Sequence, residues 1–115
     1  MSVSLQEPTF LILTALAAEP MHGYGVIQEV ATLSDGRVTL RPGTLYGALD
    51  RLVEQNLVAP DREEVVDGRL RRYYRITEAG ATVLESEAHR LTSNAEAAVR
   101  RLRGRGQPRS RLARG

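Results

Sequence analysis

The sequence predicts a mainly α-helical fold with one small β-hairpin: a winged helix-turn-helix followed by a long C-terminal helix. Three segments with helical spacing of apolar residues come first, then two β-rich segments around Asp67-Gly68, then a long helical pattern. We expect residues 1–76 to form the winged domain, 77–103 a dimerisation helix and 104–115 a disordered Arg-rich tail.

The first two helices are bounded by turn-forming residues. Pro8 opens the first, FLILTALAA follows, and Glu19-Pro20 ends it. This helix is apolar almost all round, so it should be buried. His22 precedes the second helix, which Ser34-Asp35-Gly36 ends. Residues 38–40 then predict a short β-rich piece.

The third helix begins within RPGTLYGALDRL and ends near Asn56. Its apolar face is predicted to hold Leu45, Leu49, Leu52 and Val53. Gly47 and Ala48 are small where larger side chains are usual. We expect these two residues on the outer face, where they would let another molecule approach the backbone closely.

The hairpin is predicted from Leu57–Val66 and Arg69–Ile76 around Asp67-Gly68, because both turn positions tolerate positive φ. In the second arm Tyr74 and Ile76 should face inward, which leaves a basic outer face. Thr77 is a good N-cap for the final helix, which should run to about Arg103.

Composition limits the possible functions. The chain has 115 residues, 42% of them hydrophobic, which suits one globular domain. No apolar run approaches the ~20 residues that cross a bilayer, and there is no cysteine, so a cytoplasmic protein is expected. The sequence holds no phosphate loop, nucleophile elbow or buried carboxylate pair. We therefore expect no enzymatic activity, no metal and no cofactor.

Charge is distributed unevenly along the chain. All 16 basic residues are arginines, and seven of them follow Ala98 with no acidic residue among them. The first 98 residues hold nine arginines against 14 acidic residues, so they are net acidic. The basic tail could strengthen DNA binding through counterion release, or it could serve solubility alone.

The order of the elements indicates a DNA-binding surface. In a winged helix-turn-helix the third helix enters the major groove near its N-terminus. Thr44, Tyr46 and Arg51 would then contact base edges and phosphates, and Arg69 and Arg71 of the wing would contact mainly phosphates.

Each of these residues also has a purely structural interpretation. Tyr24 and Tyr46 could be core aromatics. Arg51 could pair with Asp50 or Glu54, and the wing arginines with Glu63 and Glu64, although exposed pairs of this kind contribute only ~0–1 kcal/mol. His22 could be a ligand, but a cap or turn role is expected. His89 could pair with Glu85 one turn earlier.

The final helix has the spacing of a helix with a partner. Apolar residues recur at spacings of about 4 and 3, as in coiled coils: Leu84, Ala88, Leu91, Ala95, Ala98 and Leu102. We call these six residues the seam. Three alanines make it thin, so we expect Phe10 and Leu13 of the first helix to help close a homodimer. A helix folded back on its own monomer is the alternative.

Three separated motifs give the sequence a family resemblance. EPTFLILTALAAEPMHGYGVIQEV, LRPGTLYGALDRLVEQNLV and GRLRRYYRITEAG, which lie within roughly residues 5–90, resemble the PadR family of bacterial transcriptional regulators, in particular its short members with one C-terminal dimerisation helix. The resemblance implies a homodimer that binds a pseudo-palindromic operator, usually as a repressor, and often releases DNA when a small molecule binds near the dimer interface.

By position, the motifs that face DNA in this family match Tyr24, Thr44, Leu45, Tyr46 and the wing tip at Gly68-Arg69. Arg41 lies directly before the third helix and joins this set. The final helix lacks aromatic residues, which argues against an effector held there between ring systems. A different class of function stays open at this point: a winged-helix adaptor that binds an acidic protein through its basic wing.

Overall fold

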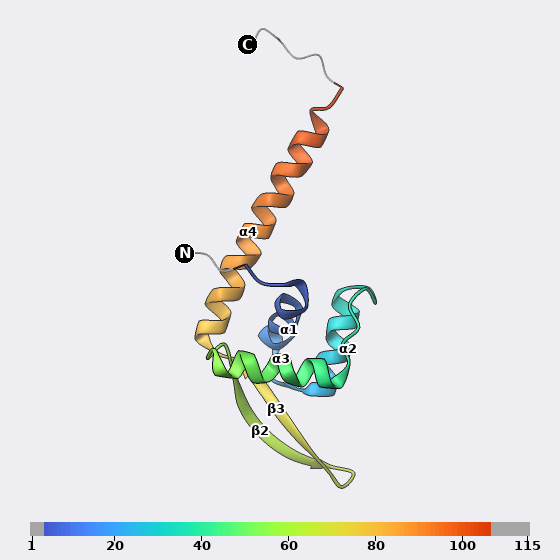
Figure 1. Ribbon diagram of the computed structural model, residues 1–115, viewed down its shortest axis with the longest axis vertical. Coiled ribbons are helices and arrows are strands. Elements are labelled where there is room, and N and C mark those ends of the chain that lie inside the picture. The colour runs from blue at the N-terminus through green and yellow to red at the C-terminus, as the bar shows by residue number, and fades with distance from the viewer. Residues whose placement is uncertain (1–3, 107–115) are drawn as a thin grey trace.

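The computed structural model describes residues 4–106, and it confirms the predicted fold class. The chain forms four helices and three strands in this part, drawn in Figure 1: α1 (Glu7–Ala18), β1 (Met21–His22), α2 (Gly23–Leu33), α3 (Pro42–Glu54), β2 (Val58–Val66), β3 (Arg69–Ile76) and α4 (Glu78–Arg103). Residues 107–115 of the predicted tail lie outside the described residues.

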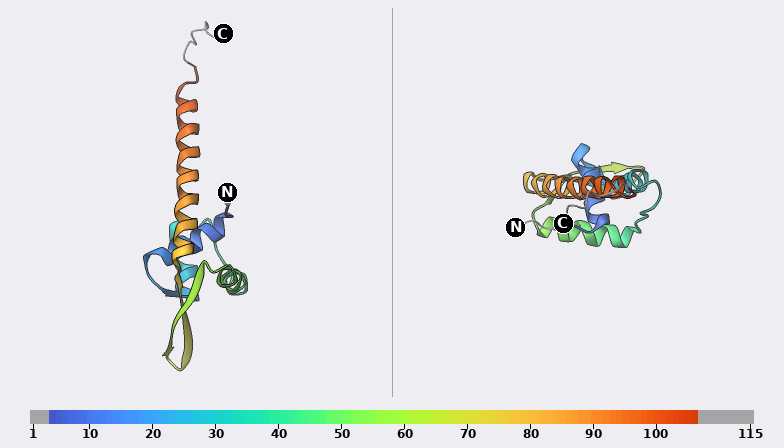
Figure 2. Two further views of the ribbon diagram at one scale, coloured as in Figure 1. Left: turned by 90° about the vertical axis from the view of Figure 1, so that its left-hand side faces the viewer. Right: turned by 90° about the horizontal axis from the view of Figure 1, so that it is seen from above.

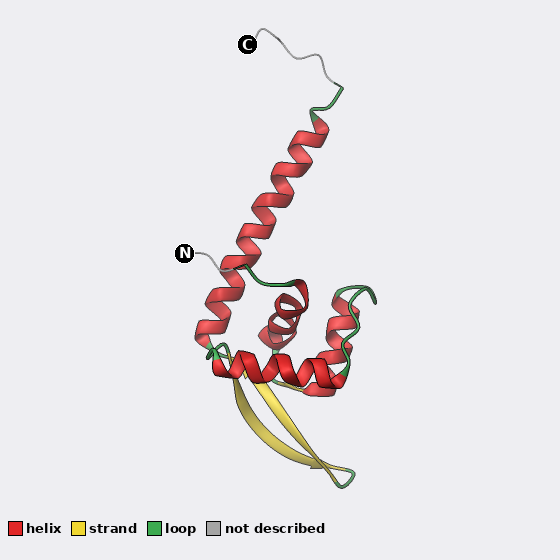
Figure 3. Ribbon diagram, viewed as in Figure 1, coloured by secondary structure: helices red, strands yellow, loops and turns green. Residues whose placement is uncertain are grey.

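The molecule is elongated because α4 and the hairpin extend in opposite directions from the helical body. Its principal extents are 72 × 30 × 21 Å. Figure 2 shows α4 continuing far beyond the other elements, and Figure 3 shows the hairpin leaving the body at the other end. A helix of 26 residues rises about 39 Å, so α1, α2 and α3 can cover only its first turns.

The core lies where α1, α2 and α3 meet the base of the hairpin. Leu16, Val30, Leu49 and Val58 are among its buried members. Leu13 also belongs to it and has no exposed surface. The prediction that the Leu13 side chain helps close a dimer interface is therefore wrong, because the chain's own core already covers it. Phe10 is half-buried and keeps a surface for such a contact.

The predicted caps hold the helices in place. His22 caps α2, because its Nδ1 accepts the Gly25 N–H at 3.2 Å. Thr77 caps α4 through its Oγ1, which accepts the Gly80 N–H at 2.9 Å. Asn56 follows the end of α3 with φ of 64°, a left-handed conformation that asparagine tolerates. These sequence-level assignments are confirmed.

The sheet has one strand more than the hairpin. Asp67 and Gly68 turn with φ of 52° and 75°, as predicted, and β3 lies between β2 and β1. Residues 38–40 form no strand, contrary to the prediction. Val38 and Leu40 instead pack their side chains against the core, and the third strand forms at Met21–His22 beside Tyr73 and Tyr74.

A tight joint sets the direction of α4. Leu57 O accepts the Thr77 N–H at 3.1 Å, and Thr77 Oγ1 donates to Asn56 O at 2.7 Å. Gly80 packs so closely that a Cβ there would overlap Leu57 O and lie 2.9 Å from Ile76 Cγ1. The end of α3 and the start of α4 are thereby fixed to each other.

A buried carboxylate ties the N-terminal segment to α4. Glu87 is only 2% exposed, and its Oε2 accepts the Leu5 N–H at 3.1 Å and an Arg90 Nη2 proton at 2.6 Å. The hydrogen bond from Arg90, with that from Leu5, keeps the pKa of Glu87 below its usual value although burial opposes this. The ion pair lets a charged side chain lie between the segment and the helix.

No helix in the described part of the chain is long and apolar enough to cross a membrane.

We predict that Gly80→Ala lowers the free energy of unfolding by about 1–3 kcal/mol, because the added methyl overlaps a backbone oxygen that cannot rotate away. Gly104→Ala is the matched control, since its Cβ would make ordinary contacts at 3.7 Å and should change stability by less than about 0.5 kcal/mol. Urea unfolding of both variants measures the difference, and equal stabilities would contradict this account of the joint.

Candidate nucleic-acid interface

A groove opens where the N-terminus of α2, the side of α3 and strand β3 of the wing come together. Its volume is about 560 Å³. Seven residues line it: His22, Tyr24, Tyr46, Arg69, Leu70, Arg71 and Arg72. The groove thus brings together four of the predicted site residues, Tyr24, Tyr46, Arg69 and Arg71, from three separate segments of the chain.

Tyr46 reaches this groove because Gly23 has no side chain. A Cβ on Gly23 would overlap the hydroxyl oxygen of Tyr46 and lie 2.6 Å from its Cζ. The ring therefore lies directly on the first turn of α2. This contact fixes the position of α3 against α2. Tyr46 as a whole residue remains 44% exposed.

Neither groove tyrosine is a core residue. Tyr24 is 63% exposed and Tyr46 44%, whereas Tyr74 on β3 is 8% exposed. The sequence left open that Tyr24 and Tyr46 are core residues, and their exposure in the single chain excludes this. Two half-free aromatic rings in a basic groove are suited to apolar contact with bases and to hydrogen bonding through their hydroxyls.

The wing arginines divide into paired and unpaired groups. Arg72 lies 3.3 Å from Glu63, and Arg75 lies 3.7 Å from Asp61. Within residues 4–106, no carboxylate lies within ion-pairing distance of Arg69 or Arg71. The two arginines predicted to contact phosphates are therefore the two whose charge the wing does not neutralise.

Glu64 makes a different contact from the predicted one. Its Oε1 accepts the Tyr73 hydroxyl proton at 2.8 Å. The Tyr73 ring in turn meets the His22 ring edge-on, with centroids 5.3 Å apart. This chain of contacts fixes the imidazole at the floor of the groove, next to Arg71, whose Nη1 lies 3.4 Å from His22 Nε2.

The outermost line of α3 carries almost no side chain at its N-terminal end. A Cβ added at Gly43 would meet no atom within 4 Å, and one added at Gly47 would meet only Arg51 Nη1, at 3.7 Å. Ala48, expected beside them, is instead 8% exposed and packs in the core. Successive residues turn by about 100°, which places Ala48 toward the buried Leu45 and Leu49. The predicted stretch of small residues on the outer face of α3 is therefore present, and it consists of Gly43 and Gly47.

Leu45 is fully buried, so its predicted side-chain contact with DNA is wrong; it anchors α3 to the core. Arg41 and Thr44 are exposed at the start of α3, as the prediction requires. Gly68 lies at the wing tip with open space around it.

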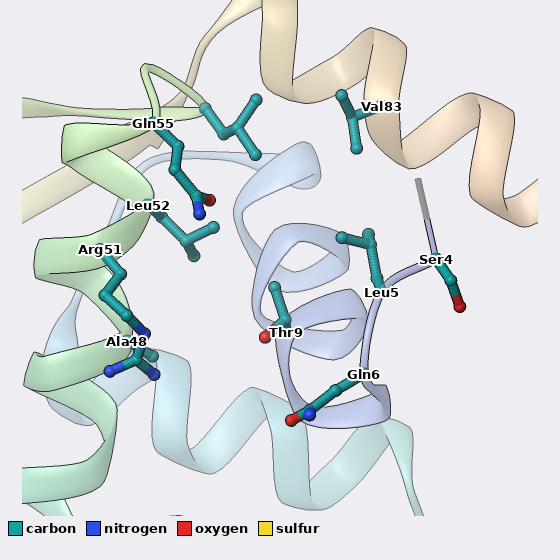
Figure 4. A pocket seen from close by; sticks show the side chains of 10 residues that line it. Ser4, Leu5, Gln6, Thr9, Ala48, Arg51, Leu52, Gln55 and Val83 are labelled. Atoms are coloured by element: carbon teal, nitrogen blue, oxygen red, sulfur yellow. The ribbon is translucent and has the colours of Figure 1, made fainter. Parts of the chain in front are cut away.

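Arg51 is separated from Tyr46, because five residues along a helix turn the side chain by about 140°. Figure 4 shows its side chain beside Ala48, on the flank of α3 that faces the segment of Gln6 and Thr9. It lines a second groove of about 460 Å³ between α3, this segment and Val83 of α4. No ion pair joins it to Asp50 or Glu54 among residues 4–106. The structure therefore does not bring Arg51 together with the wing.

Sequence reasoning missed three residues of the groove: His22, Leu70 and Arg72. The sequence indicated only a cap or turn role for His22, and Leu70 falls by alternation on the same side of the strand as Tyr74, which was expected to face inward. Leu70 is 56% exposed because the hairpin extends past the core at that point. Its cross-strand partner Val65 is exposed as well, so the wing tip carries an apolar pair on its surface.

The distal half of the seam is uncovered. Leu91 is 41% exposed and Leu102 60%, and every residue from Leu91 to Gly106 is exposed. Leu84 instead packs partly against the chain's own core, and Ala88 is half-buried. The alternative of a helix folded back on its own monomer is therefore wrong for this chain, because residues 91–106 are all exposed and α4 extends away from the body (Figure 1).

Comparison with known proteins identifies this architecture. The model of the transcriptional regulator PadR-like family matches residues 12–86, which include all of α2, α3 and the hairpin. The chain belongs to the PadR-like family. This is a family of transcriptional regulators and not of enzymes, as expected. In the described part of the chain, no three potential ligands are grouped closely enough to hold a metal ion.

The relatives include proteins of similar and of greater length. Transcriptional regulator Rv3488 of Mycobacterium tuberculosis is 40% identical over 80 residues, which are 70% of this chain and 71% of that protein. Transcriptional regulator YqjI of Escherichia coli is 34% identical over 85 residues, or 74% of this chain and 39% of that protein. A 37.1 kDa protein of a Streptomyces fradiae transposon is 44% identical over 81 residues, and the chain spans 22% of it.

Solved structures share the fold. A PadR family transcription regulator from Clostridium difficile superimposes with a TM-score of 0.66 at 26% identity, covering 84% of this chain and 99% of that one. The Bacillus subtilis PadR in complex with operator DNA gives a TM-score of 0.61 at 16% identity, covering 70% of this chain and 45% of that one. The winged fold with a long C-terminal helix is thus common to this chain and PadR regulators.

Two glycine substitutions should have opposite effects on stability. Gly23→Ala should lower the free energy of unfolding by about 1–3 kcal/mol, because Tyr46 must move. Gly47→Ala should raise it by about 0.5–1 kcal/mol, because alanine favours an open helix position. Urea unfolding compares them, and a Gly23→Ala protein as stable as the wild type would refute the close contact between α2 and α3.

Proposed function

We propose that this protein is a homodimeric regulator of PadR type that binds a pseudo-palindromic DNA operator through the groove around Tyr24 and Tyr46, and that it acts as a repressor. The observation that carries this proposal is the meeting of two exposed tyrosines with Arg69 and Arg71, whose charges have no partner among residues 4–106, in one groove beside the outer edge of α3. A polyanion with accessible base edges matches this surface.

The surface has parts suited to different tasks. Gly43 and Gly47 give the α3 backbone clearance near base edges, with Thr44 and Tyr46 at its two flanks. Arg41, Arg69 and Arg71 would neutralise phosphates and orient the domain without reading sequence. Arg51 lies on the other flank of α3, where a phosphate beyond the far edge of the major groove could meet it. The support from known proteins is the fold shared with the PadR that binds operator DNA.

Pairing through α4 would give two copies of this surface. The exposed seam from Leu91 to Leu102 leaves apolar area that a second copy can cover. A twofold axis would place two α3 helices on successive major-groove turns about 34 Å apart. The half-buried Phe10 on α1 can contribute at the margin, in place of the buried Leu13.

Relief by a small-molecule effector is part of the proposal that rests on the family resemblance. The expected place is near the dimer interface, and for it we propose the groove of about 460 Å³ beside Val83 of α4, the helix through which the dimer would form. No aromatic residue lines this groove, so it would hold a ligand through polar groups such as Arg51 and Gln55 and not between rings.

Footprinting on DNA upstream of the protein's own gene tests the proposal. We expect a protected pattern with twofold symmetry and half-sites about 10 base pairs apart. Absence of any salt-sensitive protection there would favour the protein-binding adaptor instead.

On the protected duplex, Arg69→Ala should weaken operator and random DNA alike and reduce the salt slope of log K by about 0.9 for each protomer, or about 1.8 for the dimer. Tyr46→Ala should cost about 1–3 kcal/mol on the operator and less on random DNA, because base contacts are lost. Gly47→Ala should bind the operator more weakly although its fold is more stable. Titrations at several salt concentrations measure all three, and equal losses on both duplexes for Tyr46→Ala would contradict its role.

Leu91→Asp should weaken self-association by at least about 2 kcal/mol, or about 30-fold, because it puts a charge into the proposed interface. Ser93→Asp is the matched control: it adds the same charge two residues later, on the opposite side of α4. Sedimentation equilibrium measures both proteins. The proposal of an α4 dimer fails if the two substitutions act equally or if the wild type is a monomer.

A further inference from the structure

We propose that His22 also contacts DNA: the Nε2–H of its neutral imidazole and the Arg71 guanidinium together bind one backbone phosphate. This inference rests on the proposed function, since it assigns a new contact within the same groove. It goes beyond the cap role that the sequence indicates for this residue.

The cap decides which ring nitrogen carries the proton. His22 Nδ1 accepts the Gly25 N–H at 3.2 Å. A neutral imidazole has one accepting and one donating nitrogen, so an accepting Nδ1 leaves the proton on Nε2. The helix therefore fixes the tautomer, and Nε2 becomes a hydrogen-bond donor in the groove.

That donor faces another donor. Arg71 Nη1 lies 3.4 Å from His22 Nε2, and a guanidinium only donates. The two nitrogens therefore cannot bond each other while the cap is in place. No carboxylate among residues 4–106 pairs with Arg71 to supply an acceptor. A phosphate oxygen accepts from both groups at once, and its charge strengthens the bonds.

The ring is held ready for this contact. Tyr73 meets it edge-on at an interplanar angle of 85°, and the Tyr73 hydroxyl is itself anchored to Glu64. Arg62 lies over the Tyr73 ring, 3.9 Å from the centroid. A ring held by the Gly25 N–H at one edge and by Tyr73 beside it loses little conformational entropy when it binds.

The surroundings keep His22 neutral at pH 7 and above. Burial lowers the pKa of its imidazole, the charge of Arg71 lowers it further, and Glu64 opposes them weakly. Protonation would also place a proton on Nδ1 and break the cap on Gly25. A bound phosphate favours the protonated ring, but only at the cost of that hydrogen bond.

The test replaces the ring while keeping the cap. Asparagine and serine are both good N-caps, and neither reaches as far as the imidazole. His22→Asn and His22→Ser should each bind the footprinted duplex and a random duplex about 5-fold to 10-fold more weakly, because each protomer loses one hydrogen bond, with an unchanged salt slope. Arg71→Ala should reduce the slope by about 0.9 for each protomer, or about 1.8 for the dimer. Wild-type affinity should be constant from pH 7 to pH 8.5.

The chain has two histidines, so His89→Asn on α4 is the matched control and should bind as the wild type does. Circular dichroism should show the same helix content in all four variants. The inference is overturned if either cap-preserving variant binds as tightly as the wild type, or if His22→Asn lowers the salt slope, which would make the ring charged in the complex. The proposed function itself would be refuted if the wild type showed no salt-sensitive DNA binding. That outcome is distinct from a failure of the His22 inference, which requires a wild type that binds and variants that bind equally well.

Discussion

The arrangement of this molecule depends on the contact between Gly80 and the Leu57 carbonyl. Thr77 closes the same joint from both sides, since it bonds Asn56 O and caps the helix that follows. Because no side chain fits at Gly80, the first turn of α4 lies directly against the loop that ends α3. This contact therefore sets the direction in which the long helix leaves the helix that borders the groove.

The groove shows how a mostly acidic domain can present a basic surface. The first 98 residues carry more acidic than basic residues, but on the wing Glu63 and Asp61 form ion pairs with Arg72 and Arg75. On the wing, the arginines without a carboxylate partner among residues 4–106 are Arg69 and Arg71, which lie beside two exposed rings. Net charge would have hidden this, because the sign of a surface depends on which charges are already paired.

Periodicity and end signals predicted most of the fold. Pro8, Ser34, Asn56 and Thr77 each bound a helix in the structure as the sequence indicated. Residues 38–40 misled because the apolar side chains of an extended segment, here Val38 and Leu40, can pack against the core without a partner strand. Strand β1 was missed because two residues carry no alternation, and only pairing with β3 makes them a strand.

The site was predicted in outline. Its tyrosines and wing arginines follow from the order of the elements and the family resemblance, but their convergence with His22 depends on tertiary contacts. Leu45 lies on the apolar face that the sequence predicted, and only its match to the family motif assigned it to DNA. Ala48 was placed outside because the periodicity does not say how far around the helix the apolar face extends, and Leu13 because the sequence does not show that the chain's own core covers it. Arg51 was expected beside Thr44 and Tyr46 at the DNA surface, but it lies on the flank of α3 that faces away from the wing.

The Gly23 contact has a consequence for engineering this domain. The ring at position 46 occupies the space of a missing side chain on another helix, so the two positions form one unit. Transplanting a third helix from a different regulator would leave a hollow above residue 23 or force a collision, unless both positions were exchanged together. Redesign of DNA preference in this scaffold therefore begins with a pair of helices and not with one.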